Sequence, residues 1–360
     1  MLTYRPSRAA TPSMPEAKHG IIGGLFGLEV TATESSKEPL FASLSRTYFL
    51  NARCAIYEIC RCLKPRVVWL PSYLCSALLE PFLKLSVPVR YYDASPQSKV
   101  PANDWVDQIT RGDLVLVVHY FGFPNKTLPA SEIGRRGGVI LEDASQALFA
   151  KQQYQESIGI VFSARKFFGV PDGGVLATLR PNVLDGPELG PPPEDWWSSA
   201  YDVSQMRREF DLAGGENRWF PLFKQVEESF PLGSYRCSDL ARKLIEKGVD
   251  YPLMKKTRRE NYMALADRLR GFALFPELDD ETVPLGFPVC VHEDRRDHVL
   301  EQLYSQGIYP PVHWRLEGIV PEEHRESHLL SRRILTLICD QRYTICEMKR
   351  QIEAFLSAVQ

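Results

Sequence analysis

Short apolar runs alternate with amphipathic stretches along the chain from about residue 45. The apolar runs are continuous rather than alternating, which is typical of strands covered on both faces of a sheet. They lie at residues 66–70, 87–92, 113–119, 138–141, 159–162 and 174–178. Between them, helical spacing is found at residues 53–62, 76–85 and 129–136. This order predicts an α/β fold with a mainly parallel central sheet.

The flanking segments have other patterns. Residues 1–44 predict an N-terminal leader and arm, in which the glycines of residues 20–29 match neither a dinucleotide-binding motif nor a P-loop and favour a packed turn. Residues 45–238 would form the large domain, with the proline-rich stretch 184–232 as an interface segment. Residues 239–360 predict one long helix to residue 269, bent near Pro252, followed by a small α+β domain with an antiparallel sheet.

Composition and charge exclude several classes of protein. A chain of 360 residues with 44% hydrophobic and 24% charged residues is an ordinary globular composition. A net charge of -2 does not favour nucleic-acid or anionic-membrane partners. No apolar run is long enough to span a bilayer, and the first residues lack the apolar segment of a signal peptide. The sequence therefore predicts a cytoplasmic protein with no membrane or nucleic-acid partner.

The sequence predicts neither disulfides nor a metal site. The eight cysteines include no Cys-x-x-Cys pair, which favours reduced, mostly buried thiols. His324 and His328 have helical spacing but lack the intervening pattern of a zinc-binding helix. A solvated helix face is the favoured interpretation of these two histidines.

Polar side chains stand where two neighbouring strands are predicted to end. Asp143 follows one apolar run, with Gln146 within one helical turn of it, and Ser163 and Lys166 follow the next run. Ligands of α/β proteins bind at the carboxyl ends of the strands. An acid that holds a pyridine nitrogen and a lysine that forms a Schiff base suit pyridoxal 5'-phosphate (PLP). Each of these residues also has an ordinary interpretation. Asp143 could cap a helix, Ser163 could lie in a turn, and Lys166 could be a surface lysine.

Other positions could complete such a site. The chain enters a helix at Ala52 and Arg53, where backbone N–H groups and a guanidinium could hold a phosphate. The ordinary alternative is a helix simply capped by Asn51. Tyr73 and Cys75 follow another strand end and are candidate neighbours of the cofactor ring.

Taken together, these motifs resemble a known family. Glu142-Asp-Ala-Ser-Gln-Ala, Phe162-Ser-Ala-Arg-Lys and Gly173-Gly-Val-Leu are similar to motifs of the DegT/DnrJ/StrS family of fold-type-I, PLP-dependent sugar aminotransferases. The resemblance extends with gaps from about residue 45 to the C-terminus. It implies that Lys166 is the Schiff-base lysine, that Asp143 pairs with the pyridinium nitrogen and that Gln146 lies near the ring oxygen.

The resemblance also implies a phosphate site and a homodimer. Ser163 and the backbone of Ala52 and Arg53 would bind the phosphate, and Ser234 stands where the partner subunit usually lends an asparagine. Three positions depart from the common family pattern: the Ser163-to-Lys166 spacing is shorter, Ala52-Arg53 replaces Gly-Thr, and Ser234 replaces asparagine. The acceptor is therefore left open between a nucleotide sugar and another carbonyl compound.

The resulting expectation is a PLP-dependent aminotransferase. It would move an amino group from an amino acid donor to a keto or aldehyde acceptor through a Lys166 aldimine. His119, Arg165 and Arg315 are candidate substrate contacts. The alternatives are a PLP-dependent dehydratase or lyase, and a non-catalytic binding protein with the same fold.

Overall fold

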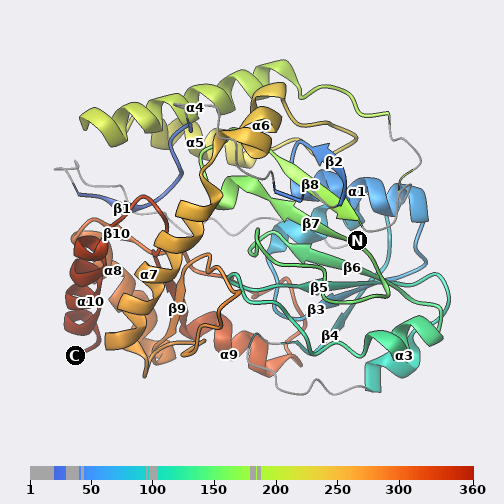
Figure 1. Cartoon of the computed structure of the whole chain (residues 1–360). Coiled ribbons are helices and arrows are strands. Elements are labelled where there is room, and N and C mark those ends of the chain that lie inside the picture. The colour runs from blue at the N-terminus through green and yellow to red at the C-terminus, as the bar shows by residue number, and fades with distance from the viewer. Residues whose placement is uncertain are drawn as a thin grey trace.

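A seven-stranded sheet forms the centre of the molecule in the computed structural model (Figure 1), which describes residues 20–29, 40–41, 44–94, 96, 104–178, 184 and 188–360. The strand order is β2-β8-β7-β6-β5-β3-β4. Strands β4, β3, β5, β6 and β7 are parallel to one another. Strand β8 is antiparallel to β7, and β2 is antiparallel to β8. Their bounds are β2 Ser45–Phe49, β3 Val68–Pro71, β4 Val89–Tyr92, β5 Leu114–Val118, β6 Val139–Ala144, β7 Ser157–Ser163 and β8 Gly174–Thr178.

The predicted fold class is confirmed, with one strand missed. The six predicted apolar runs correspond to β3 through β8. Strand β2 was not predicted because it is a partly exposed edge strand with the polar sequence Ser-Arg-Thr-Tyr-Phe. Of the leader and arm predicted for residues 1–44, residues 1–19 lie outside the described residues.

Short helices connect the strands of the sheet. They are α1 Ala52–Leu63, η1 Ser76–Leu79, α2 Glu80–Lys84, η2 Asp104–Gln108, α3 Ala130–Arg135 and η3 Ala164–Lys166. The start of α1 is fixed by Asn51, whose side chain accepts a 2.8 Å hydrogen bond from the Cys54 N–H. The helix predicted for residues 76–85 is a 3₁₀ turn followed by one short helix with Pro81 in its first turn.

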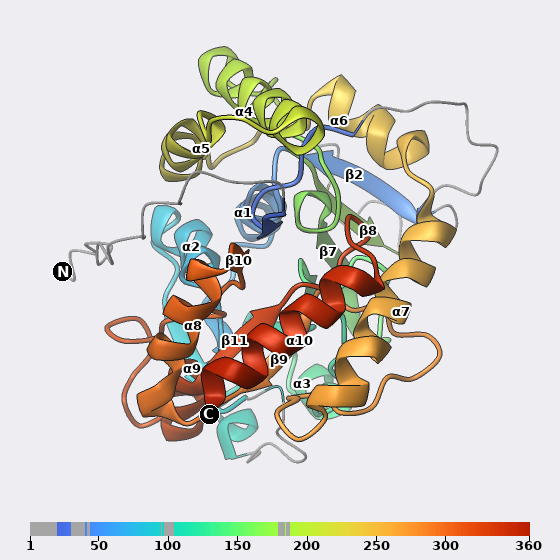
Figure 2. The same ribbon diagram turned by 90° about the vertical axis from the view of Figure 1, so that its left-hand side faces the viewer.

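Two helices, α4 Glu194–Ala213 and α5 Trp219–Glu228, pack against each other beside the sheet (Figure 2). The Trp196 ring lies 4.4 Å from the Phe230 ring. The Trp197 Nε1–H donates a 3.1 Å hydrogen bond to the buried carboxylate of Asp172. Both tryptophans are thus anchored within this chain.

The helix predicted over residues 239–269 is interrupted, so that prediction was wrong. The chain forms α6 Asp239–Lys243, a π-helical turn at Leu244–Gly248 and then α7 Tyr251–Leu269. Val249 between them is extended. Asp250 begins α7 by accepting a hydrogen bond from the Leu253 N–H, and Pro252 occupies the first turn, where its missing N–H costs nothing.

The C-terminal part has its own apolar core. Strands β9 Phe287–Cys290 and β11 Ile334–Leu337 form the predicted antiparallel pair. They pack with α7, α8 Arg296–Ser305 and α10 Ile345–Val359 around side chains such as Phe287, Leu335 and Phe355. The remaining elements are η5 Glu293–Arg295, β10 Ile308–Tyr309 and α9 Arg325–Arg333.

Residues 20–29 form a packed arm, as predicted. Strand β1 Ile22–Gly23 pairs in parallel with β10 of the C-terminal part. Further along, the Leu28 N–H donates to the Ser204 carbonyl of α4, and the Glu29 N–H donates to the Gly169 carbonyl. The arm therefore touches both the C-terminal part and the turn that follows Lys166.

The prediction that His324 and His328 lie on a solvated face was wrong, because both are buried. His324 Nδ1 lies 2.6 Å from Asp93 Oδ1, and His328 Nε2 lies 3.1 Å from the Val320 carbonyl. All eight cysteines are free, and four of them are buried, namely Cys54, Cys60, Cys237 and Cys339. Within the described parts of the chain, no helix is long and apolar enough to cross a membrane.

Candidate active site

The carboxyl end of β6 carries Asp143, buried beside the ends of β5 and β7. One carboxylate oxygen of Asp143 accepts a 2.8 Å hydrogen bond from the Ser145 N–H, which fixes the turn that follows the strand. Gln146 lies in that turn, and its Oε1 accepts a 3.1 Å hydrogen bond from the Phe121 N–H beyond β5. The two side chains therefore stand where ligands of α/β proteins bind.

Ser163 ends β7, and Lys166 ends the 3₁₀ turn that follows it. Ser163 is buried, whereas Lys166 is exposed. Since β6 and β7 are parallel neighbours, with Ala144 opposite Phe162, Asp143 and Ser163 reach the same edge of the sheet. The structure thus places Asp143 and Ser163 at the ends of two adjacent strands, with Gln146 and Lys166 in the turns that follow them.

The start of α1 lies against the same edge. Ser163 is paired with Gly174 of β8, and a Cβ on Gly174 would lie 2.5 Å from the Ala52 nitrogen. Only glycine allows this approach. The first N–H groups of a helix have no acceptor within the helix, so the N–H groups of Ala52 and Arg53 are suited to an anion beside Ser163.

Two guanidinium groups flank this region. Arg53 and Arg165 lie over the Phe230 ring, with distances of 5.1 and 4.6 Å from Cζ to the ring centroid. Arg53 pairs with Glu80, and Arg165 pairs with Glu227. Both cations are therefore held in place, with carboxylates that offset part of their charge.

An aromatic group forms another wall. The Tyr73 ring lies 5.6 Å from the Tyr120 ring and 5.4 Å from the Trp314 ring, and Phe121 stacks on Trp314 at 6.4 Å. His313, next to Trp314, lies 5.4 Å from the Phe121 ring, and its Nδ1 is 2.9 Å from Thr336 Oγ1. Burial, with the charge of Lys166 adding to it, lowers the pKa of His313 to about 3. A neutral imidazole therefore stands near Lys166 at pH 7.

Several predicted residues have their contacts elsewhere. His119 is fully buried, with its Nε2 at 2.9 Å from Glu142 Oε2 and its Nδ1 accepting from the Asn125 N–H. Both ring nitrogens are thus engaged inside the chain. Ser234 donates to Glu58 of α1. Cys75 is half-buried directly before η1, and Arg315 is exposed in the loop after β10.

Sequence reasoning gave some neighbours of the site no role. Tyr120 and Phe121 lie in the motif Val118-His-Tyr-Phe-Gly, but the apolar pattern there does not reveal that the Phe121 N–H anchors Gln146. His313 and Trp314 come from the C-terminal part of the chain. Their approach to Tyr73 and Phe121 depends on how the C-terminal part folds back, which no local pattern encodes.

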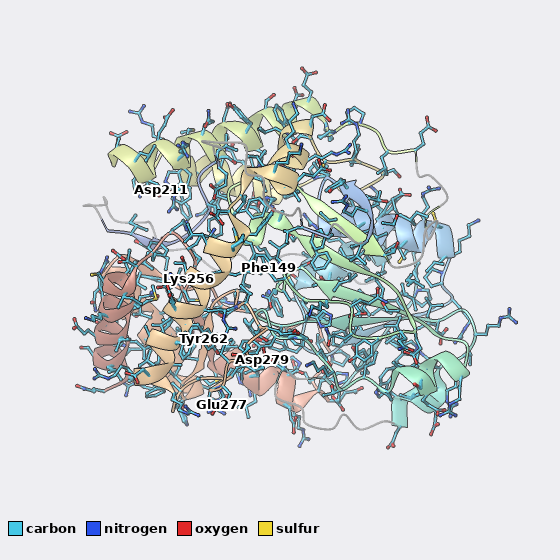
Figure 3. The ribbon with its side chains drawn as sticks, viewed as in Figure 1. Phe149, Asp211, Lys256, Tyr262, Glu277 and Asp279 are labelled. Atoms are coloured by element: carbon cyan, nitrogen blue, oxygen red, sulfur yellow. The ribbon has the colours of Figure 1, made fainter. Side chains whose placement is uncertain are left out.

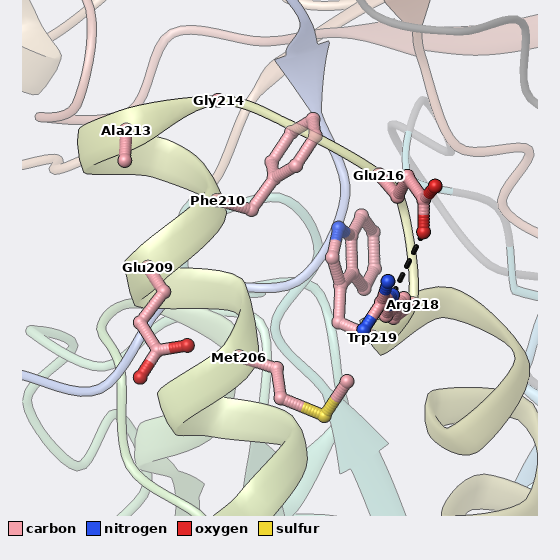
Figure 4. A pocket seen from close by; sticks show the side chains of 8 residues that line it. All are labelled: Met206, Glu209, Phe210, Ala213, Gly214, Glu216, Arg218 and Trp219. Atoms are coloured by element: carbon pink, nitrogen blue, oxygen red, sulfur yellow. Dashed lines mark hydrogen bonds and ion pairs between the residues drawn. The ribbon is translucent and has the colours of Figure 1, made fainter.

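Hollows that open on the surface of the described part of the chain include two that are not lined by the predicted cofactor residues. One of about 340 Å³ lies between α4 and the start of α5, with Phe210 and Trp219 in its wall (Figure 4). The other, of about 290 Å³, is lined by Gly122, Phe149 and Val283 among others. Gly122 directly follows Phe121, so this second hollow is the one adjacent to the candidate site.

Buried polar atoms show whether the site suits a bound cofactor. Gln146 Nε2 and the Tyr73 hydroxyl are both buried, and neither has a hydrogen-bond partner among the described residues. Unpaired buried donors are costly, so they favour a ligand that carries acceptors at this position. The oxygens of PLP are such acceptors. The donor set, one lysine and one carboxylate therefore fit PLP.

Comparison with known proteins gives the same fold. No family model matches the chain. One curated relative is dTDP-4-dehydro-2,3,6-trideoxy-D-glucose 4-aminotransferase from Saccharopolyspora spinosa, 23% identical over 239 residues. The alignment covers 62% of this chain, which spans only 60% of the relative.

Solved structures match over more of the chain. The PLP form of Spr1654 from Streptococcus pneumoniae has a TM-score of 0.63 at 16% identity, covering 87% of this chain and 86% of that one. The aminotransferase TlmJ from Streptoalloteichus hindustanus has a TM-score of 0.61 at 17% identity, covering 88% and 86%. DesI, solved with its TDP-sugar product, has a TM-score of 0.61 at 17% identity, covering 88% and 81%. The resemblance predicted from the motifs is confirmed at the level of fold and distant sequence similarity.

Proposed function

We propose, from the fold that this chain shares with the sugar aminotransferases, that it is a PLP-dependent aminotransferase. One observation supports the proposal: Asp143 and Ser163 end two adjacent parallel strands beside the start of α1, and Gln146 and Lys166 lie in the turns that follow. Scattered surface residues would not be expected to converge there. The unpaired donors of Gln146 and Tyr73 support the same ligand.

Each group has a distinct task in this proposal. PLP, when bound, supplies an electron sink that stabilises a carbanion at the carbon bearing the amino group. Lys166 would hold the cofactor covalently through Nζ and, when released, carry a proton to and from the substrate carbon. Asp143 would keep a proton on the pyridine nitrogen. Ser163 and the N–H groups of Ala52 and Arg53 would bind the phosphate.

We propose that the acceptor is the keto carbon of a nucleotide-linked deoxysugar. The curated relative is named for such a compound, and DesI was solved with a TDP-sugar product. Arg53 and Arg165 supply cations beside the proposed phosphate site and support an anionic substrate. The family resemblance implies an amino acid as the amino donor. Glutamate is the first donor to test.

The first experiment tests the cofactor and Lys166. Wild-type protein incubated with PLP should retain a visible absorbance band after desalting, and borohydride should fix the cofactor on the peptide that contains Lys166. Lys166→Ala should lose the fixed cofactor and roughly a thousandfold or more of the glutamate half-reaction rate. Lys349→Ala, a change on the exposed face of α10, is the matched control and should behave as wild type. A wild-type protein that ignores PLP would refute the proposal.

A second experiment separates the reaction types and the acceptors. Glutamate should convert the bound cofactor to pyridoxamine phosphate (PMP) and release 2-oxoglutarate, whereas a dehydratase or lyase would not complete this exchange. A dTDP-linked 4-keto sugar should then convert the PMP form back to the PLP form. Faster conversion of the PMP form to the PLP form by a simple aldehyde or 2-oxo acid would contradict the sugar assignment. The aminotransferase assignment would remain in place.

We also propose, on the family resemblance, that the active unit is a homodimer with sites at the interface. Within one chain the Ser234 hydroxyl donates to Glu58, and the Ser234 carbonyl accepts a hydrogen bond from the Gly190 N–H. Light scattering coupled to size-exclusion chromatography should give about twice the chain mass. A monomer that is fully active at assay concentration would contradict this proposal.

A further inference from the structure

One buried guanidinium joins the C-terminal part of the molecule to the turn that carries Lys166. Arg258 lies on α7, the helix that bears the labelled Lys256 and Tyr262 in Figure 3. It is fully buried. Its Nη2 donates a 2.9 Å hydrogen bond to the carbonyl of Phe167, the residue directly after Lys166.

A second side chain reaches the same carbonyl. Gln341 Nε2 donates a 2.7 Å hydrogen bond to the Phe167 oxygen, and Gln341 Oε1 accepts a 2.8 Å bond from Arg258 Nε. The two side chains thus hold each other as well as the carbonyl. Both acceptor positions of one peptide oxygen are filled from residues 91 and 174 positions away along the chain.

The setting of Arg258 is unusual for a buried cation. Its remaining donor, Nη1, bonds to the carbonyls of Pro284 and Leu285, so all four of these acceptors are uncharged. The guanidinium also lies 4.8 Å from the Phe167 ring centroid. Burying an arginine costs free energy even when its donors are satisfied. The nearby buried carboxylate of Asp340 offsets part of this cost, and the hydrogen bonds fix the guanidinium against the Phe167 carbonyl.

We propose that Arg258 and Gln341 are positioning residues for Lys166. By fixing the Phe167 peptide they set the direction in which the neighbouring, exposed Lys166 side chain leaves the turn. The inference rests on the proposed function. It goes beyond that function by assigning the alignment of the lysine to two residues of the C-terminal part.

The test uses the difference between PLP and PMP. Lys166 Nζ would form a bond to the aldehyde carbon of PLP with release of water, so PLP affinity would depend on where the lysine lies. PMP carries an amine at that carbon and cannot form the bond. A residue that acts through Lys166 therefore affects PLP binding and spares PMP binding, whereas a general packing defect weakens both.

Dissociation constants for PLP and PMP are measured by titration for wild type, Arg258→Met and Gln341→Leu, with the borohydride-fixed fraction as a second readout. We expect PLP binding to weaken about tenfold or more in both variants, since each loses a hydrogen bond to the carbonyl. PMP binding should stay within about threefold of wild type. Gln341→Leu keeps the test available if Arg258→Met fails to fold.

Gln351→Leu is the matched control. Gln351 is buried and bonds only to the backbone of Ile338 and to Met348 among the described residues, away from Phe167. It should lose comparable stability while binding both cofactor forms as wild type does. Equal weakening of PLP and PMP binding, or unchanged binding of both, would overturn the inference. A wild-type protein that binds neither compound would instead refute the proposed function.

Discussion

His313 shows how a single residue can make the stability of this protein depend on pH. Its pKa falls from 6.5 to about 3 on folding, mainly through burial. Between these two values the unfolded chain binds a proton at this residue and the folded chain does not. The free energy of unfolding therefore decreases as the pH falls from 6.5 towards 3. At pH 5 this contribution amounts to roughly 1–2 kcal/mol.

The expected result is a smaller pH dependence in His313→Asn. The asparagine can keep a polar contact with Thr336 but does not titrate. Urea unfolding at pH 7.5 and pH 5 should show that wild type loses roughly 1–2 kcal/mol more than the variant on acidification. His298→Asn, which changes an exposed histidine on α8, should retain the wild-type loss. An identical loss in wild type and His313→Asn would contradict the prediction.

At the residue scale, the sequence predicted where chemistry could occur better than it predicted which groups support it. Asp143, Ser163 and Lys166 stand at ends of continuous apolar runs, and this pattern places them at one edge of a parallel sheet. Arg258 lies in the middle of a helix, 92 positions beyond Lys166. No periodicity indicates that its side chain bonds to Phe167, because that contact depends on the packing of α7.

At the scale of elements, the arm of residues 20–29 restricts the turn after Lys166. A Cβ on Gly169 would lie 1.6 Å from the carbonyl oxygen of Gly27, which is a backbone atom and cannot rotate away. Gly169→Ala should therefore displace the arm and destabilise the protein by roughly 1–3 kcal/mol in urea unfolding. Gly271→Ala is the matched control, because a Cβ there would meet nothing within 4 Å.

The two glycine variants separate local crowding from a general effect of the substitution. Gly271→Ala should change the free energy of unfolding by less than about 0.5 kcal/mol, or raise it slightly by restricting the unfolded chain. If Gly169→Ala proved as stable as Gly271→Ala, the arm would not pack against this turn in solution.

The break between α6 and α7 shows why an element boundary escaped prediction. Helical spacing continues through residues 239–269, and a proline within such a pattern suggests a bend at that point. The observed boundary instead follows from a helix cap. The Asp250 side chain accepts a hydrogen bond from the Leu253 N–H, and Pro252 therefore lies in the first turn of a new helix. The sequence contains the capping residue, but the spacing of apolar residues masks it.

At the scale of the whole molecule, the sequence predicts the elements but leaves the strand order open. The order β5-β6-β7 follows the chain, whereas β8 and β2 add to one edge, with β8 antiparallel to β7 and β2 antiparallel to β8. Similarly, the C-terminal part was expected as a small α+β unit, yet its contacts with Phe167 and Trp314 come from tertiary packing. These contacts determine what surrounds Lys166.

Those contacts lead to a prediction about the entire chain. PMP present at 100 times its dissociation constant should stabilise the folded state by about 2.7 kcal/mol. Because Arg258 and Gln341 join the Lys166 turn to the C-terminal part, hydrogen exchange should slow both in residues 139–168 and in residues 338–343. In Gln341→Leu the protection of residues 338–343 should be reduced while that of residues 139–168 remains. Protection confined to residues 139–168 in wild type would show that the two parts respond to the cofactor independently.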